Sequence, residues 1–193
     1  MPSTALLQWR GARAAVLDEI EAAHALVGGT GLGRRYATQQ LNRAYALLLS
    51  SEFQGLCRDL HSECVTVIVA STPAATQALS QAQYLWGRQL TRGNPQSGAI
   101  GSDFGRLGVV FWDEVCALHA QHQRRRELLD ELVTWRNAIA HNDFDPAVFG
   151  PNPTLHLVQV RAWRRALNLL AEAFDSVMYN YLTGLLGAAP WPP

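Results

Sequence analysis

Arg136, Asn137 and His141 are the residues whose types and spacing best suit chemistry, and they close an apolar run. A free histidine side chain has a pKa of about 6.5, so His141 suits proton transfer at neutral pH. Arg136 offers a permanently charged fork of donors, which matches a phosphate or the charge that develops on a pentacoordinate phosphorus. Asn137 can hold the imidazole or a ribose hydroxyl. The three residues predict acid–base chemistry at a phosphate group.

The segment that positions these residues has the pattern of an amphipathic helix. Its apolar residues recur three and four positions apart, as on one helical face: Leu128, Leu132, Trp135 and Ile139. Arg136 falls inside this stripe, where a charge must be paired or face a wet crevice, because an unpaired buried charge is costly. Asn137 and His141 are four residues apart and therefore lie on one edge of the stripe.

Residues 136–141, RNAIAH, resemble the R-N-x-x-x-H signature of the HEPN superfamily, small all-α proteins that are often ribonucleases of toxin–antitoxin and phage-defence systems. Residues 41–45 and 53–60, LNRAY and FQGLCRDL, resemble the long first helix of the HEPN group associated with RiboL-PSP domains. That group usually has Glu after the Phe, where this chain has Gln54. The resemblance covers about residues 36–186.

The resemblance implies an endoribonuclease that uses no metal ion or other cofactor, with Arg136, Asn137 and His141 as catalytic residues. The ribose 2′-OH is an internal nucleophile next to its own phosphate, so cleavage leaves a 2′,3′-cyclic phosphate. Single-stranded RNA is the expected substrate, because a regular A-form helix hinders in-line attack. The resemblance also implies a toxin or phage-defence component, with an antitoxin or defence protein as a possible partner.

The spacing of the motif favours a dimer. On a regular helix, Arg136 and His141 point about 140° apart around the axis, so one chain presents them poorly to one phosphate unless the last turn unwinds. In HEPN proteins, two copies of the motif meet across a two-fold dimer cleft. We therefore expect a homodimer with the site at the cleft, where an Arg within an apolar stripe suits a partly wet interface.

One departure from the family pattern concerns regulation. In HEPN toxins that a nucleotidyltransferase partner silences, a Tyr lies two residues after the His. This chain has Asp143 at that position, followed by Phe144, so we do not expect regulation by that modification.

Two other functions remain open. A non-catalytic HEPN-like module that binds RNA, a nucleotide or a protein partner would have the same fold, with Arg136 and His141 as remnants or ligand contacts. A plain dimeric scaffold explains the apolar stripes but not Arg136. The presence of Arg, Asn and His together favours the enzyme.

Four further arginines are candidate RNA contacts. Arg92 and Arg106 lie in Thr91–Gly108, a stretch with five glycines that we interpret as a mobile loop. A solvated connection without RNA contacts explains this stretch more readily than RNA contact does. Arg124 and Arg125 open a run of three arginines that acidic residues follow, and helix-surface ion pairing explains this run as well as RNA contact does.

Composition sets the class of the protein. A chain of 193 residues with 48% hydrophobic residues suits one domain, 1–193, with a large core. The formal net charge of zero gives no overall attraction to nucleic acid or membranes. Every basic residue is Arg, a bias along the whole chain that GC-rich coding explains more readily than selection for phosphate binding.

The cysteines and the absence of targeting patterns predict a reduced cytoplasmic protein. Cys57, Cys64 and Cys116 are an odd number without metal-site spacing. Cys57 and Cys64 should lie about 10 Å apart along one helix, beyond disulfide reach. No apolar run approaches a membrane span, and Met1–Ser3 opens no signal peptide.

Helical periodicity continues through the rest of the chain. We expect an all-α antiparallel helical bundle of the HEPN type, with a core over about residues 36–186. The expected helices are Thr4–Val27, Arg35–Ala70, about Pro73–Leu90 with Thr72 as its N-cap, Val109–His122 with a break near Gln121–Gln123, Arg124–His141 and Leu155–Leu186. Loops are expected at Gly28–Gly33 and Asp143–Thr154, and a frayed tail at Ala188–Pro193.

Two weaker patterns are interpreted as structural. The glycines of Gly28–Gly33 precede a helix, but no strand comes before them and no Lys-Ser/Thr follows, so they favour a helix–helix loop over a phosphate cradle. His119 and His122 are three residues apart without a third ligand, so no metal site is predicted.

Overall fold

The structure, a computed structural model, describes residues 1–27 and 34–191, which form helices and turns without strands. The fold class is all-α, as the sequence predicts. The helices are α1 (Thr4–Gln8), α2 (Ala14–Val27), α3 (Arg34–Ala70), α4 (Gln77–Leu85), α5 (Ser97–Gly105), α6 (Phe111–Leu118), α7 (His122–His141), α8 (Pro146–Phe149) and α9 (Leu157–Leu186). A π-helical turn at Trp9–Arg13 joins α1 to α2, and 3-10 turns at Ala74–Thr76 and Gln89–Thr91 flank α4.

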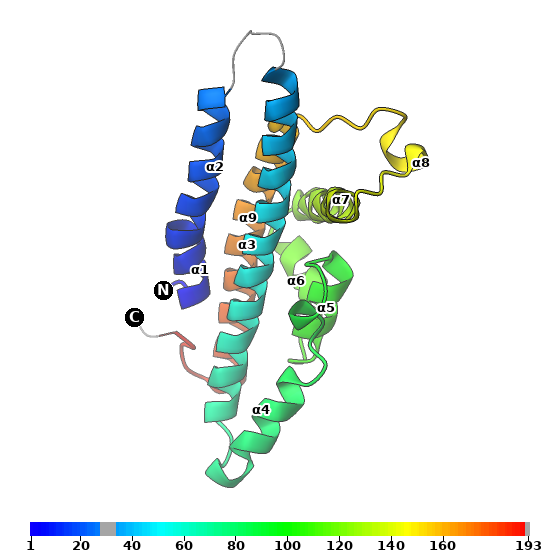
Figure 1. Cartoon of the computed structure of the whole chain (residues 1–193). Coiled ribbons are helices and arrows are strands. Elements are labelled where there is room, and N and C mark those ends of the chain that lie inside the picture. Colours follow the sequence, from blue (N-terminus) through cyan, green and yellow to red (C-terminus); the bar gives the residue numbers. More distant parts are fainter. Residues whose placement is uncertain (28–33, 192–193) are drawn as a thin grey trace.

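Three long helical stretches form the main bundle (Figure 1). Near the start of α3, Asn42 donates a hydrogen bond to the carbonyl of Leu155, just before α9. Farther along both helices, the rings of Phe53 and Phe174 lie 5.9 Å apart. Helices α3 and α9 therefore run side by side in the same direction, whereas α1–α2 runs antiparallel to both.

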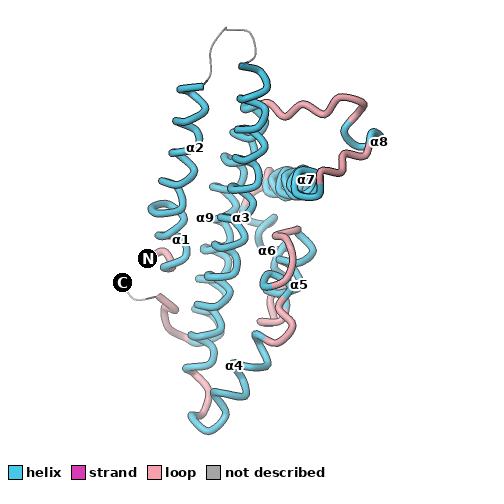
Figure 2. The backbone as a smooth tube through the Cα atoms, in the orientation of Figure 1, coloured by secondary structure: helices cyan, strands magenta, loops and turns pink. Residues whose placement is uncertain are grey.

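Helix α7 lies across this bundle, so Figures 1 and 2 look almost down its axis. It packs against both α3 and α9. Leu132 and Trp135 of the predicted stripe are buried, together with Leu129 and Val133 beside it. Arg136 is seven, four and three residues beyond three of these side chains, so it continues the buried row.

The stretch Thr91–Gly108 was expected to be a mobile loop, and this prediction is wrong because the stretch contains α5. Ile100 and Phe104 of α5 are fully buried. A Cβ atom on Gly101 would lie 2.8 Å from Cδ1 of Trp112, so this glycine permits α5 to pack closely on α6. Here a glycine that resembled loop composition serves helix packing.

Helix α4 ends at Leu85, earlier than expected. The chain turns there because Trp86 has an extended ψ of 123° and Gly87 a positive φ of 69°, which favours glycine. Thr72 does not act as the expected N-cap, since its hydroxyl donates to the carbonyl of Val69 in the last turn of α3.

Two smaller differences lie on either side of α7. The break before it falls at residues 119–121, slightly earlier than expected. The expected loop Asp143–Thr154 contains the one-turn helix α8, whose N-terminus is capped by Asp145 through a hydrogen bond from the backbone N–H of Ala147.

Both terminal segments contribute to the core. Leu6 and Trp9 are buried, so the core begins well before residue 36. Trp191 is also buried, so the prediction of a frayed tail is wrong for that residue. The expected loop Gly28–Gly33 and residues 192–193 lie outside the described residues.

Cys57, Cys64 and Cys116 are free thiols, as the sequence predicts, and the first two are buried. Burial raises the pKa of the Cys64 thiol well above its usual value. Within residues 1–27 and 34–191, no helix has both the length and the apolar composition that a membrane span needs.

Candidate functional site

The last turns of α7 are regular and do not unwind. The helix continues to His141, and Asn142 then adopts a left-handed conformation with φ 51°. The backbone N–H groups of Asn142 and Asp143 donate to the carbonyls of Ile139 and Ala138, which closes the helix end. Arg136 and His141 therefore keep the roughly 140° separation of a regular helix, and a single chain does not bring them together.

Arg136 is half-buried, as its position in the buried row predicts. Its Nη1 donates to Oδ1 of Asn137 over 3.3 Å. Among the described residues it forms no ion pair, and the remaining residues, 28–33 and 192–193, contain no Asp or Glu. Arg136 is therefore a partly desolvated cation whose hydrogen-bond partner is a neutral amide.

Asn137 connects α7 to the segment that precedes α5. Its Oδ1 accepts hydrogen bonds from Arg136 and also from Nδ2 of Asn94. Sequence reasoning missed Asn94, although the pair Asn94-Pro95 is a turn signal. We call residues 88–97 the strap, because they cross from α4 to α5 and contact α7 at Asn137.

Two anchors fix the ends of the strap. The Asp103 carboxylate on α5 accepts the backbone N–H groups of Gln89 and Leu90 at 2.9 and 2.7 Å. At the other end, Asp130 on α7 accepts both the N–H and the hydroxyl of Ser97. The strap is thus held at α5 and at α7.

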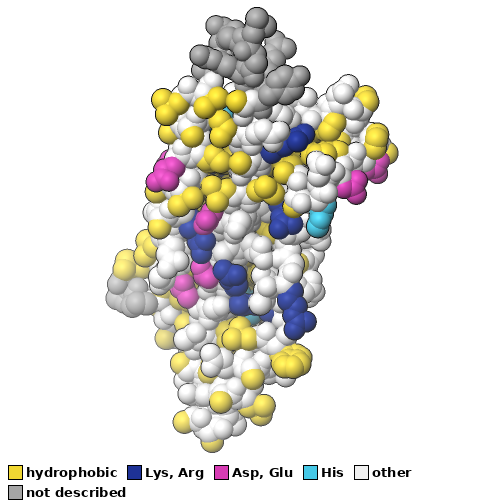
Figure 3. All heavy atoms as spheres, viewed as in Figure 1, with side chains coloured by type: hydrophobic (Ala, Val, Ile, Leu, Met, Phe, Trp, Pro, Cys, Tyr) yellow, Lys and Arg dark blue, Asp and Glu magenta, His cyan; other side chains and the backbone are white. Residues whose placement is uncertain are grey.

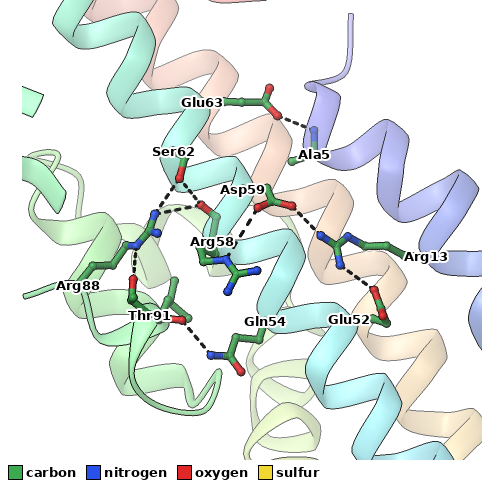
Figure 4. A network of polar contacts seen from close by, with 11 residues as sticks. Ala5, Arg13, Glu52, Gln54, Arg58, Asp59, Ser62, Glu63, Arg88 and Thr91 are labelled. Carbon is green, nitrogen blue, oxygen red and sulfur yellow. Dashed lines mark hydrogen bonds and ion pairs between the residues drawn. The ribbon is translucent and has the colours of Figure 1, made fainter.

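A third anchor comes from α3. Gln54 Nε2 donates to the carbonyls of Leu90 and Gly93, and Figure 4 shows this side chain reaching from α3 toward the strap. A Glu at this position would have no N–H to donate. The amide that distinguishes this chain from the RiboL-PSP-associated group therefore has a structural role next to Asn94.

His141 is exposed at the end of α7. Within the part of the chain that the structure describes, no other group forms a hydrogen bond with its imidazole. No hydrogen bond from residues 1–27 or 34–191 therefore selects the tautomer of His141, and a second molecule can reach the exposed ring.

The four other candidate arginines are dispersed. Arg92 is exposed on the strap, two residues from Asn94, whereas Arg106 donates to the carbonyl of Gln83 on α4. Arg124 and Arg125 begin α7, about 18 Å along its axis from Arg136. Of these four arginines, Arg92 is the one that lies on the strap, whose Asn94 bonds to Asn137.

The contacts of Arg124 and Arg125 agree with the surface interpretation of that run. Arg124 forms an ion pair with Glu127 over 2.9 Å, and Arg125 donates to Gln121 and contacts His122. Both arginines can still meet a phosphate, but neither lies close to the candidate site.

The segment after His141 is tied down by aromatic packing. The Phe144 ring lies 6.2 Å from that of Trp135 and 5.5 Å from that of Phe149. The guanidinium of Arg43, from α3, lies 4.8 Å from the Phe144 ring centroid on its face. Phe144 therefore has a packing role, while Asp143 is exposed.

Among residues 1–27 and 34–191, no three His, Cys, Asp or Glu side chains lie together as a potential metal site. The rings of His119 and His122 are 5.8 Å apart, and His122 is buried. Its pKa is lowered by burial and by the neighbouring Arg125.

Comparisons of the chain with protein-family models, with curated proteins and with solved structures found no significant match.

Proposed function

We propose that this protein is a metal-independent endoribonuclease that cleaves single-stranded RNA and leaves 2′,3′-cyclic phosphate ends, with Arg136, Asn137 and His141 in its active site. The proposal rests on the RNAIAH resemblance and on one structural observation: Arg136 is a half-buried cation whose hydrogen-bond partner among the described residues is a neutral amide. A partly desolvated charge without a counter-charge is costly, and an anionic phosphate would relieve that cost.

The proposed reaction assigns a separate task to each group. A neutral His141 imidazole accepts the proton of the ribose 2′-OH, whose oxygen then bonds to the adjacent phosphorus. The bond from phosphorus to the 5′-oxygen breaks, and that oxygen takes a proton from an imidazolium or from water. Arg136 stabilises the charge on the phosphoryl oxygens, and its guanidinium is held by Asn137, to which Asn94 also donates.

A homodimer is part of this proposal, because one chain directs Arg136 and His141 to different sides of α7. In a two-fold assembly, Arg136 of one subunit and His141 of the other can face the same phosphate. A toxin or defence role and an antitoxin-like partner follow only from the resemblance, and they remain proposals of the same kind.

We propose that RNA binds along arginines that have no close ion pair with an acidic side chain among the described residues. We define the basic strip as Arg58, Arg88, Arg92 and Arg136. Arg88 donates to three neutral oxygens, and Arg58 has only a long 4.0 Å contact with Asp59. Arg58 lies on α3, as does Gln54, whose side chain bonds to the strap that carries Arg88 and Arg92. Figure 3 shows basic side chains along the middle of the face that carries α3. Phosphates along a single strand would complement these charges.

RNA cleavage without metal tests the proposal. Purified protein in EDTA should cut an unstructured, end-labelled RNA and leave cyclic-phosphate termini. Cleavage that requires an added divalent metal would contradict the mechanism. Tight RNA binding without cleavage would instead support the non-catalytic module. The lack of a hydrogen-bond partner for His141 among the described residues also favours that alternative.

Mixing two inactive variants tests the shared site. Subunit exchange between Arg136→Ala and His141→Ala proteins creates heterodimers in which one of the two composite sites is complete. Recovery of about one quarter of wild-type activity is expected after random exchange. No recovery, despite exchange shown by differently tagged subunits, would mean that each site uses one chain only.

A further inference from the structure

A cavity of about 760 Å³ opens between the first turns of α3 and the segment that leads into α9. Its volume falls within the range of about 300–1,000 Å³ that is typical of small-molecule sites. Apart from Leu155 and Pro153, its walls are polar or charged; they comprise Thr38, Gln39, Gln40, Asn42, Arg43, Asn152, Thr154 and His156. We call it the α3 cavity, and none of the motif residues of α7 lines it.

The walls of the α3 cavity carry positive charge without acidic groups. None of the lining residues is Asp or Glu, and Arg43 forms no ion pair among the described residues. Residues 28–36, which precede the lining residues in sequence, contain no Asp or Glu either. Asp143 and Asp145 flank the Phe144 ring on which Arg43 stacks, but both are exposed and neither forms an ion pair with Arg43 among the described residues. The walls of the cavity therefore hold the charge of Arg43 without an acid beside it, and they favour an anionic ligand.

Two adjacent residues of the wall also have unmet hydrogen-bonding groups. Asn42 is 6% exposed, and its Nδ2 donates to the Leu155 carbonyl, but its Oδ1 has no hydrogen-bond partner among the described residues. Nε of Arg43 is buried and also has no partner. A buried polar group without a hydrogen-bond partner is unfavourable, so a ligand that supplies both an acceptor and a donor would be favoured over a bare anion.

We propose that the α3 cavity binds a phosphate-bearing small molecule of mononucleotide size. The phosphate would meet the charge of Arg43, and hydroxyl or amino groups of the same molecule would bond to the amides of Asn42 and its neighbours. This site is separate from the proposed RNA-cleaving site and does not depend on that function.

Arg43 connects the α3 cavity to the segment that follows the motif through a side-chain contact. Arg43 stacks on Phe144, which packs against Trp135 and lies three residues after His141. A ligand that engages Arg43 therefore changes the surroundings of Phe144 and, through it, of Trp135. Tryptophan fluorescence can report the binding event.

Titration with adenosine 5′-monophosphate (AMP) tests the site. Calorimetry and tryptophan fluorescence should both detect one AMP per chain, with at least tenfold weaker binding of inorganic phosphate and of adenosine. Arg43→Gln should weaken AMP binding at least tenfold. Gln40→Glu places a negative charge on an exposed wall residue without altering the core, so it should weaken binding similarly even if Arg43→Gln is unstable.

Two control variants separate this site from other sources of binding. Gln81→Glu adds the same charge to an exposed residue of α4, at the far end of α3, and should leave AMP affinity unchanged. Arg136→Ala should also leave it unchanged. Absence of AMP binding, equal affinity for AMP and phosphate, or loss of binding only in Arg136→Ala would each overturn the proposal.

Discussion

The arginines on the two sides of α3 have opposite surroundings (Figure 4). On the side of α1–α2, Arg13 donates to Glu52 and to Asp59, each over 2.6 Å. On the side of the strap, within residues 1–27 and 34–191, Arg88 donates only to hydroxyl and carbonyl oxygens, and Arg136 only to an amide. Arg13 is thus ion-paired with two carboxylates, whereas Arg88 and Arg136 form no ion pair among the described residues.

The pKa values of these side chains follow the same division. Burial opposes the charge of Arg13, but its hydrogen bonds to Glu52 and Asp59 outweigh that effect and raise its pKa. Burial lowers the pKa of Arg88, and Arg58 lowers it further against the attraction of Asp103. The ion-paired Arg13 stabilises the packing of α1–α2 on α3. We infer that Arg88 and Arg136, which form no ion pair among the described residues, are available to bind an external anion.

A direct comparison of Arg136 with Arg13 should give the largest effect. Arg136→Ala should lower the rate of RNA cleavage by a factor of about 10²–10³ because phosphoryl charge loses its partner, while the melting temperature stays close to that of the wild type. Arg13→Ala should leave cleavage intact. His141→Ala should cost a factor of about 10²–10⁴.

Two exchanges serve as controls for these activity measurements. Arg165 is exposed on α9, and His24 lies on α2 away from α7, so Arg165→Ala and His24→Ala should be fully active. Equal losses of activity in Arg13→Ala and Arg136→Ala would remove the distinction between structural and functional arginines.

His61, which lies close enough to Arg88 to feel its charge, should make the free energy of unfolding depend on pH. Burial, followed by Arg88, lowers the pKa of this fully buried histidine to about 4 from 6.5, although its bond to the Asp103 carbonyl acts in the opposite direction. Between these values the unfolded chain binds a proton and the folded chain does not, so falling pH favours unfolding. The loss amounts to about 3 kcal/mol, complete near pH 4 and absent above about pH 6.5.

Denaturant unfolding at several pH values measures this contribution. His61→Gln keeps a donor for the Asp103 carbonyl but does not titrate, so its stability should fall less than that of the wild type between about pH 6.5 and pH 4. Identical pH profiles for the two proteins would show that His61 is not the group responsible.

On the paired side, Arg13→Ala should lower stability by about 2 kcal/mol, because it leaves two partly buried carboxylates without their partner. The expected fall in melting temperature is about 4–8 °C. Gly55→Ala should act in the same direction, since an added Cβ would overlap the Arg13 guanidinium that lies against this glycine. An unchanged melting temperature in both variants would show that the network contributes little.

Periodicity was sufficient to predict the long helices and the half-buried position of Arg136. It depends on neighbours three and four residues away, which are fixed once the helix forms. The contacts that complete the candidate site join residues far apart in sequence, such as Asn94 with Asn137 and Gln54 with Gly93. Helical spacing does not specify which loop will cross which helix, so these partners could not be predicted.

The glycine content of Thr91–Gly108 gave a wrong prediction because, here too, the decisive contacts join residues that are far apart in sequence. Glycine content suggested a mobile loop, but Gly101 makes room for Trp112, and Asp130 caps the start of α5 from another helix. A glycine selected for close packing and a glycine selected for flexibility look identical in one sequence. Only the tertiary contact distinguishes them.

The smallest expected effect comes from Gln54→Glu, which removes one of the three anchors of the strap. The variant tests whether this anchor is needed to hold Asn94 against Asn137, next to Arg136. A carboxylate cannot donate to the carbonyls of Leu90 and Gly93 and would be repelled by them, at a cost of about 1 kcal/mol. Hydrogen exchange should therefore become faster for amides of the strap but not for those of α3. RNA cleavage should fall only a few-fold, because Asn94 is held less firmly against Asn137 while the reacting groups remain. Gln81→Glu makes the same charge change on an exposed residue of α4 and should alter neither measurement. If the strap amides of Gln54→Glu exchange hydrogen at the wild-type rate, the other two anchors are sufficient to hold the strap.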